Sequence, residues 1–339
     1  MHNKDHKWTV PAAYLKLFLQ HAKASGIALQ ALLHGTGLDE DSLLGSRQAV
    51  GIDSLQTVLD RMTGIQGEGW HLGLAERLTV PAHGALGFAV VTAPDIRASI
   101  GVLIRYLGIR GPFLWPAAAL EGEYFVIRFY ESLALGPIRR PMVELALLSV
   151  QGLIERPLGR SISGSRLALA MPEPAYRPLL EEAFHCDLTF AARRHALHLP
   201  ADWLDEPCAL HDQAMHGYLL GRCEDDLRES AGGLPAEAAV RQALLANPGS
   251  MPGLAEIAKQ QNLSSRTLIR RLKIGNTSYR AIREGVRKTL AADYLANSNL
   301  SISRIAYRLG YQDPSNFGRA FRGWFGITPG TYRKNARTR

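Results

Sequence analysis

Arginine side chains stand at matched positions in two copies of one pattern near the end of the chain. Arg270 follows the segment Leu-Ala-Glu-Ile-Ala and a short turn, and Arg319 follows Ile-Ser-Arg-Ile-Ala and a similar turn. A guanidinium group on an exposed helix can hold guanine O6 and N7 with two hydrogen bonds, or pair with a phosphate. A lone surface arginine is more often only solvated, but this repetition favours contact with nucleic acid.

The apolar residues of each copy predict the helices that position these arginines. They are Ile257, Ala258, Leu268 and Leu272 in the first copy and Ile305, Ala306, Phe317 and Phe321 in the second. An alanine lets two helices cross closely, and the i,i+4 pairs fix the second helix on the first. Ser264 and Asp313 are suitable N-caps. The pattern predicts two helix-turn-helix units, at about 254–275 and 302–325.

The face opposite the apolar pairs is the one that would enter a major groove. In the first copy it carries Arg266, Thr267, Ile269, Arg270 and Lys273, and in the second Ser315, Asn316, Gly318, Arg319 and Arg322.

The distribution of charge along the chain supports the same interpretation. Residues 232–339 hold 18 Lys and Arg against 5 Asp and Glu, whereas the rest of the chain is mildly acidic. A basic block beside an acidic one is typical of a polyanion-binding domain, although solubility alone could explain it.

The remainder of the chain predicts an α+β domain. Helical periodicity covers much of the first 70 residues and the segments 96–107 and 140–154, and short β-rich runs are Phe88–Val91, Tyr124–Tyr130 and Arg166–Ala170. The expected fold class is therefore an α+β sensor domain at 12–230, a linker at 231–235, and an all-α domain at 236–339 whose two helix-turn-helix units are joined by a linker helix.

Other chemistry receives little support. Cys186, Cys208 and Cys223 show neither disulfide nor zinc spacing, and His195 and His198 form an HxxH pair without further ligands at suitable spacing. We expect no metal, no cofactor and no catalytic residues. The start of the chain has no apolar signal core, and no apolar run approaches the length of a membrane span, so a cytoplasmic location is expected.

A small ligand could be held by polar and aromatic residues of the first domain. The candidates are Trp115, Arg139, Arg140 and Glu144. Arg139 and Arg140 with Glu144 could hold a carboxylate and an amine, or could form an exposed i,i+4 pair. Trp115 could line a cavity, but packing in a core or sheet is the commoner use of such a residue.

The C-terminal third resembles the AraC/XylS family of bacterial transcription regulators. The resemblance is carried by the stretch from Ile305 to Asn316, by Phe317 to Arg333 with its Gly-Ile-Thr-Pro and Tyr-Arg tail, and by Gly275 to Leu295 as linker helix. It covers about residues 235–336. In that family a rigid helix holds two recognition helices in successive major grooves, about 34 Å apart.

This resemblance implies roles for individual side chains. Those expected to face bases are Arg266, Thr267, Ile269, Arg270, Ser315, Asn316 and Arg319, with Asn316 suited to adenine. Those expected to meet phosphates are Lys273, Arg322, Arg333 and Lys334. Gly318 departs from the larger polar residues frequent there, which implies fewer base contacts in the second groove.

The first domain resembles the larger effector-binding half found in one branch of this family. Gly84 to Ala89, Glu144 after Arg140-Pro141, and Tyr176 to Phe190 carry this similarity. It implies an activator of a catabolic operon, controlled by a small metabolite such as an amino acid or by a fatty acid, with operator DNA, RNA polymerase and a second copy of the chain as partners. Two alternatives remain open: a regulator that needs no effector, and an enzyme fused to the same DNA-binding module.

Overall fold

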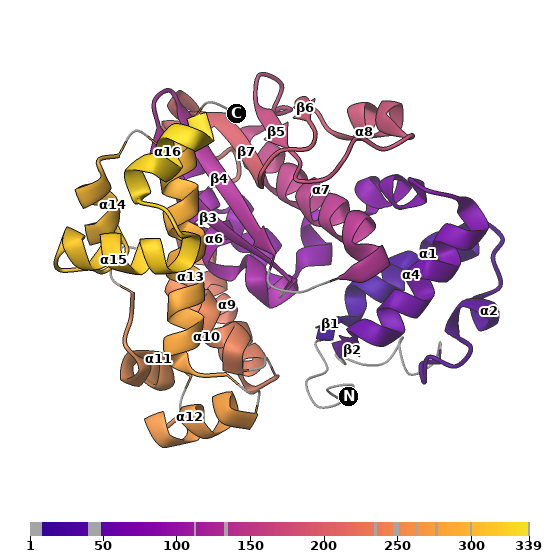
Figure 1. The fold of residues 1–339 in the computed structure, drawn as a ribbon. Helices are drawn as coiled ribbons and strands as arrows, with labels where there is room; N and C mark the ends of the chain where they lie inside the picture. The colour runs from indigo at the N-terminus through magenta and orange to yellow at the C-terminus, as the bar shows by residue number, and fades with distance from the viewer. Residues whose placement is uncertain are drawn as a thin grey trace. The chain divides into compact units, whose positions relative to one another are not determined.

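The computed structural model divides the chain into two compact units, Met1–Gly233 and Leu234–Arg339. It describes residues 9–39, 49–111, 113–131, 135–233, 236–246, 251–261, 263–274, 277–298 and 300–337. Unit 1 combines helices with a sheet, and the regular elements among the described residues of unit 2 are all helices (Figure 1). The predicted fold class is confirmed.

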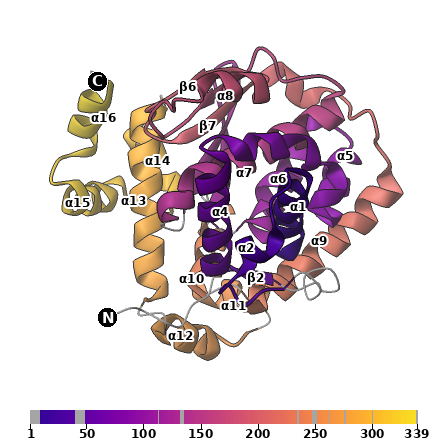
Figure 2. The ribbon, with the colours of Figure 1, turned by 90° about the vertical axis from the view of Figure 1, so that its right-hand side faces the viewer.

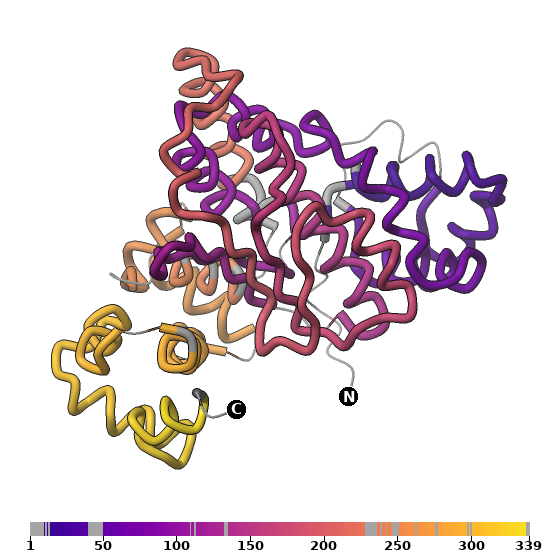
Figure 3. The backbone as a smooth tube through the Cα atoms, turned by 90° about the horizontal axis from the view of Figure 1, so that it is seen from above, coloured from indigo at the N-terminus to yellow at the C-terminus, as the bar shows by residue number. Residues whose placement is uncertain are grey.

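Unit 1 begins with a helical layer at one end, drawn in indigo in Figures 1 and 3. Its elements are β1 (Thr9–Pro11), α1 (Ala12–Ala24), α2 (Leu29–Leu33), β2 (Ala49–Gly51) and α4 (Ile52–Gln66). β1 and β2 form a small antiparallel pair. Leu15, Phe18, Leu19 and Ala22 are buried on one side of α1, as their helical spacing predicts.

A five-stranded sheet lies in the middle of unit 1, with the order β3-β4-β7-β5-β6. Its strands are β3 (Leu114–Glu121), β4 (Tyr124–Glu131), β5 (Arg166–Ala168), β6 (Asp187–Thr189) and β7 (His195–Pro200). β5 and β6 pair in parallel, and the other pairs are antiparallel. β3 contains Pro116, which cannot donate a ladder hydrogen bond. β3 is an edge strand, where a proline is tolerated.

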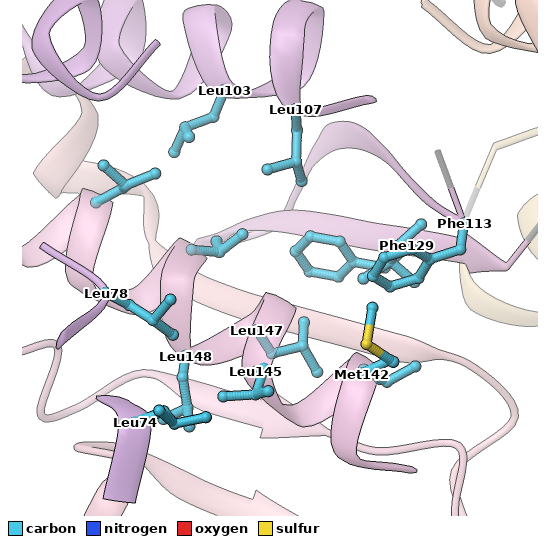
Figure 4. Packing of buried hydrophobic residues seen from close by; sticks show 14 of the residues in the cluster. Leu74, Leu78, Leu103, Leu107, Phe113, Phe129, Met142, Leu145, Leu147 and Leu148 are labelled. Carbon is cyan, nitrogen blue, oxygen red and sulfur yellow. The ribbon is translucent and has the colours of Figure 1, made fainter. Parts of the chain in front are cut away.

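Helices surround this sheet and share one hydrophobic core with the indigo layer. They are η1 (Trp70–Arg77), η2 (Val80–His83), α5 (Ala85–Val91), α6 (Ile96–Arg110), η3 (Gly136–Ile138), α7 (Arg139–Leu158), α8 (Arg177–Ala183), η4 (Ala201–Asp205) and α9 (Gln213–Gly233). α6 packs against β3, and α7 packs against α5, α6 and η1. Figure 4 shows leucines of α6, α7 and η1 converging with Phe113 and Phe129. None of the helices that the structure describes has the length and apolarity needed to span a bilayer.

Two segments have a different secondary structure from the one that the sequence predicts. Phe88–Val91 was expected to be a strand and is the last part of α5. A short apolar run has no decisive period, and here burial on several sides by α6, α7 and α9 allows a helix. Part of the expected linker, 231–233, belongs to α9, while Leu234 and Pro235 lie outside the described residues. Paired glycines weaken a helix by about 1 kcal/mol each but do not forbid it.

Unit 2 is built around its longest helix, α13 (Tyr279–Asn297). The other helices are α10 (Ala236–Ala246), α11 (Leu254–Gln260), α12 (Ser265–Ile274), α14 (Ile302–Arg308), α15 (Pro314–Phe325) and α16 (Pro329–Arg337). Within this unit, α11 and α12 lie near the start of α13, and α14, α15 and α16 lie near its other end (Figures 1 and 2). α13 buries Ile282, Val286, Leu290 and Leu295, which follow one another at helical spacing.

Candidate nucleic-acid interface

The two helix pairs of unit 2 have equivalent cores. Ile257 and Ala258 of α11 and Leu268 and Leu272 of α12 are at most 1% exposed. Their counterparts Ile305, Ala306, Phe317 and Phe321 are fully buried. The predicted core residues are therefore confirmed in both copies. In each pair the buried side chains fix which face of the second helix is left for solvent.

The turns that connect the helices are also equivalent. The backbone N–H of Leu263 donates to the Ala258 carbonyl at 2.8 Å, and that of Tyr311 donates to the Ala306 carbonyl at 3.0 Å. Both pairs are five residues apart, and the repeats are offset by one more residue only after this point. Gly310 takes a positive φ of 72° in the second turn, a conformation that favours glycine.

Each second helix has the N-cap that the sequence predicts. The Ser264 hydroxyl accepts a hydrogen bond from the Thr267 N–H at 3.1 Å. The Asp313 carboxylate accepts one from the Ser315 N–H at 2.8 Å, and Pro314 takes the first helical position. A capped helix start holds its remaining free N–H groups in a fixed direction, which suits contact with an anion.

The outer face of α12 carries the predicted contact residues of the first copy. Arg266, Arg270 and Lys273 are exposed, and Ile269 is 42% exposed. Thr267 is half-buried, with its hydroxyl 2.8 Å from that of Ser264. The side chains thus form one cationic strip with an apolar residue in its middle.

The outer face of α15 carries those of the second copy. Ser315, Asn316, Arg319 and Arg322 are all exposed. Arg319 Nη2 donates a hydrogen bond to Asn316 Oδ1 at 2.6 Å. The sequence placed these two side chains on the same face, but their direct pairing is visible only in the structure.

The long helix α13 is connected to both copies by side-chain contacts. The Tyr279 hydroxyl donates to the Pro252 carbonyl at 2.8 Å, just before the first copy. Arg287 donates to the carbonyls of Leu309 and Gly310 in the second turn, and its guanidinium lies 4.4 Å from the Tyr311 ring centroid. Burial lowers the pKa of Arg287 from its usual value. These contacts hold both helix pairs on a single rigid element.

The tail after α15 packs back onto the second copy. Tyr332 makes ring contacts with Phe321 and Phe325, with centroids 5.3 and 5.1 Å apart. Arg333, expected at a phosphate, is half-buried and donates to the Leu300 carbonyl at 2.6 Å, so part of its hydrogen-bonding capacity is used within the unit. Lys334, its predicted partner in phosphate binding, is exposed.

The predicted effector residues do not gather at one open site. Trp115 is 3% exposed and packs against Gly108 in α6. Arg139 pairs with Glu131 on β4 through two hydrogen bonds. Burial opposes ionisation of Glu131, but hydrogen bonds from His195 and Arg139 outweigh this effect and lower its pKa to about 2.

Glu144 forms the predicted i,i+4 pair with Arg140, at 3.1 Å, but the carboxylate is fully buried rather than exposed. It also accepts a hydrogen bond from the Tyr176 hydroxyl at 3.0 Å and lies 2.7 Å from His71 Nε2. Burial and this carboxylate raise the pKa of Tyr176. The polar cluster joins α7, η1 and the segment before α8.

The HxxH histidines are used separately. They are three residues apart on β7, so they point to opposite faces of the sheet. His195 accepts from the Ala170 N–H and contacts Glu131, whereas His198 packs against Tyr124. The described part of the chain contains no group of three or more potential metal ligands.

Comparison with known proteins agrees with this organisation. A family profile described as the arabinose-binding domain of AraC transcription regulators matches residues 26–208, and a helix-turn-helix profile matches residues 257–335. The first match alone covers more than half of the chain. The chain belongs to the AraC family of transcription regulators. Proteins of this family are DNA-binding transcription regulators, not enzymes. This AraC-family regulator is therefore a DNA-binding protein that controls transcription.

Individual relatives align with nearly the whole length of this AraC-family regulator. It is 31% identical to the "Ornithine utilization regulator" of Pseudomonas aeruginosa, over 96% of each sequence. It is 25% identical to an uncharacterized helix-turn-helix regulator of Mycobacterium tuberculosis, again over 96% of each. The crystal structure of the regulator CdpR from P. aeruginosa aligns over 95% of this chain and 98% of that one, with 21% identity and a TM-score of 0.46.

Proposed function

We propose that this AraC-family regulator reads its operator with the outer faces of α12 and α15. The observation that carries the proposal is the matched exposure of cationic side chains over two equivalent buried cores. Side chains proposed to contact bases are Arg266, Thr267, Ile269, Arg270, Ser315, Asn316 and Arg319. Those proposed to contact phosphates are Lys273, Arg322, Arg333 and Lys334.

The net charge of unit 2 supports this proposal. Its excess of basic over acidic residues attracts DNA at long range, and neutralising each phosphate releases bound counterions. Arg270 can specify guanine, and the exposed Ile269 beside it can contact a thymine methyl group. Because α13 is fixed to both copies, the two faces present themselves to DNA as one body.

Unit 1 is proposed to bind a small metabolite and thereby control transcription. The relative with 31% identity is named for ornithine utilisation, which supports a role in amino-acid catabolism for this chain as well. We propose that the protein activates such an operon together with RNA polymerase, as a homodimer, in the bacterial cytoplasm where its operator lies. A metabolite acts in this way only if it binds two conformations of the protein with different affinity.

The base and phosphate assignments can be tested with a matched pair of variants. Operators are first selected by the purified full chain from random duplexes, and affinity is then measured by fluorescence anisotropy at several salt concentrations. Arg270→Ala is expected to cost about 1–3 kcal/mol and to relax preference at one base pair. Lys273→Ala is expected to weaken all sequences alike and to reduce the salt slope by about 1.

Arg177→Ala in unit 1 serves as the control, since it removes the same charge from α8, where the half-buried Arg177 pairs with Glu173 and Glu181. It should leave both affinity and salt slope unchanged. Equal losses on every sequence for Arg270→Ala and Lys273→Ala would contradict the separate roles. Unchanged, tight DNA binding by both variants would show that α12 does not contact the operator.

A further inference from the structure

Three side chains on one turn of α13 contact α15 and the turn that leads into it. They are Glu284, Arg287 and Lys288, which follow one another at i, i+3 and i+4 spacing. Glu284 Oε1 accepts a hydrogen bond from Trp324 Nε1 at 2.9 Å. The Lys288 ammonium lies 5.2 Å from the centroid of the Phe325 ring, whose face attracts a cation. These two contacts fix the C-terminal end of α15.

Arg287 fixes the other end of α15, through the turn before it. Its Nε donates to the Leu309 carbonyl at 2.8 Å, and its Nη2 donates to the Gly310 carbonyl at 3.0 Å. The guanidinium also lies 4.4 Å from the centroid of the Tyr311 ring. A planar fork can make these three contacts together, whereas the point charge of a lysine cannot. Since α15 has 12 residues, its two fixed ends are about 18 Å apart.

The segment that enters the first copy reaches the same turn. Met251 lies just before α11 and is 7% exposed. A Cβ built on Gly310 would lie 3.7 Å from the Met251 side chain and 3.2 Å from Arg287 Nη2. The next residue, Pro252, is held through its carbonyl by Tyr279 of α13. The two copies therefore meet at Gly310, and α13 holds both sides of this contact.

Support at both ends determines the direction of α15 within unit 2. A helix that is held at only one end can pivot, and a tilt of about 10° would move the far end of a helix of about 18 Å by about 3 Å, close to the rise of one base pair. Contacts to base edges do not tolerate such a displacement, because hydrogen bonds weaken steeply outside a narrow range of distance and angle. Loss of one support should thus impair base reading by α15 before it unfolds the helix.

We propose that Arg287 is a positioning residue for DNA reading: it directs α15 into the second major groove, with Glu284 as the second support. Neither side chain needs to touch DNA. The inference rests on the proposed reading of DNA by α12 and α15, and it adds that base preference in the second groove depends on α13. If Arg287 only stabilised the fold, its loss would weaken DNA binding on all sequences alike.

The test uses the full chain and an operator that it selects from random duplexes. Arg270→Ala and Arg319→Ala first identify the base pairs read by α12 and by α15, as those at which each variant loses its preference. Arg287→Lys keeps the charge but cannot form the fork. It is expected to lower discrimination about three- to tenfold at the base pairs read by α15, and to leave discrimination at those read by α12 within about twofold.

Further variants and a second measurement separate positioning from folding. Trp324→Phe keeps an aromatic ring but removes the hydrogen bond to Glu284, and it should cause a loss of about two- to threefold at the same base pairs. Arg280→Met removes an exposed charge from the same helix and should leave base discrimination in both grooves unchanged. Amide hydrogen exchange of α15 should be as slow in Arg287→Lys and Trp324→Phe as in the unmodified protein.

Three results for Arg287→Lys would overturn the proposal. Equal losses at the base pairs of α12 and α15, or fast exchange of the α15 amides, would give Arg287 a purely structural role. Unchanged discrimination at every base pair would show that α15 keeps its direction without the fork. An unmodified protein that binds no duplex would instead disprove the proposed function, and this result is obtained before any variant is compared.

Discussion

The pairing of Asn316 with Arg319 leads to a quantitative prediction about DNA reading. In the free protein Arg319 Nη2 donates to Asn316 Oδ1 at 2.6 Å, and both side chains are exposed. An exposed hydrogen bond of this kind adds little to folding stability. It does restrict a long, flexible side chain before DNA arrives. Asn316 is thus expected to position Arg319 for a guanine.

The expected losses in DNA-binding free energy follow from two general contributions. A good bidentate contact to a base is worth about 1–3 kcal/mol, which is the expected cost of Arg319→Ala. Ordering one rotamer-rich side chain on binding costs about 0.5–1.5 kcal/mol. Asn316→Ala is expected to lose this amount through Arg319, which corresponds to about 2- to 13-fold weaker binding. In an Arg319→Ala background, Asn316→Ala should no longer lose this part and should cost only what its own base contact contributes, so the coupling energy should be about 0.5–1.5 kcal/mol.

The assay is a double-mutant cycle by fluorescence anisotropy on operators with single base-pair changes. Both single variants should lose discrimination at the same base pair, with melting temperatures unchanged. Asn316 and Arg322, six residues apart on α15, form the control pair and should be additive within about 0.5 kcal/mol. Additive energies for Asn316 and Arg319, with losses at different base pairs, would refute positioning and leave Asn316 with only a base contact of its own.

Three further predictions concern stability and pH. Phe321→Ala, at a fully buried position, should lower the free energy of unfolding of unit 2 by about 3–5 kcal/mol in urea titrations, leaving the transition of unit 1 unchanged. Gly108→Ala would place a Cβ 1.7 Å from the Trp115 ring and should destabilise unit 1 by about 1–3 kcal/mol. The control is Gly101→Ala, which has free space on the same helix and should be neutral or stabilising. Equal melting temperatures for the two variants would contradict this packing. The pKa of Glu131 is about 2 in the folded protein, below its ordinary value of 4.5. The contribution of this carboxylate to stability is therefore complete above pH 4.5 and disappears as the pH falls towards 2. Glu131→Gln should flatten this part of the plot of melting temperature against pH, and an unchanged plot would argue against the ion pair.

Local patterns were sufficient to predict the DNA-binding unit because its chemistry is carried by short, repeated segments. The Ile-Ala steps, the i,i+4 pairs and the caps Ser264 and Asp313 act within one helix pair, so their spacing in the sequence fixes their spacing in space. The exposed face followed from the buried one. Only the contact between Asn316 and Arg319 needed side-chain coordinates.

Unit 1 shows the opposite case. Glu144 looked like half of an exposed pair, but its other partners, His71 and Tyr176, lie 73 and 32 residues away. No local pattern could show that it is buried. The apolar run Phe88–Val91 fits a strand or a helix equally well until its neighbours are known.

The helix pairs of unit 2, their capped starts and their exposed cationic surface could be predicted from local sequence, because each depends on residues within a few turns of one another. Which polar groups of unit 1 meet depends on long-range packing. Tyr14, His83 and Arg110 come from three separate helices and show no common spacing. Long-range packing alone brings these three side chains into contact.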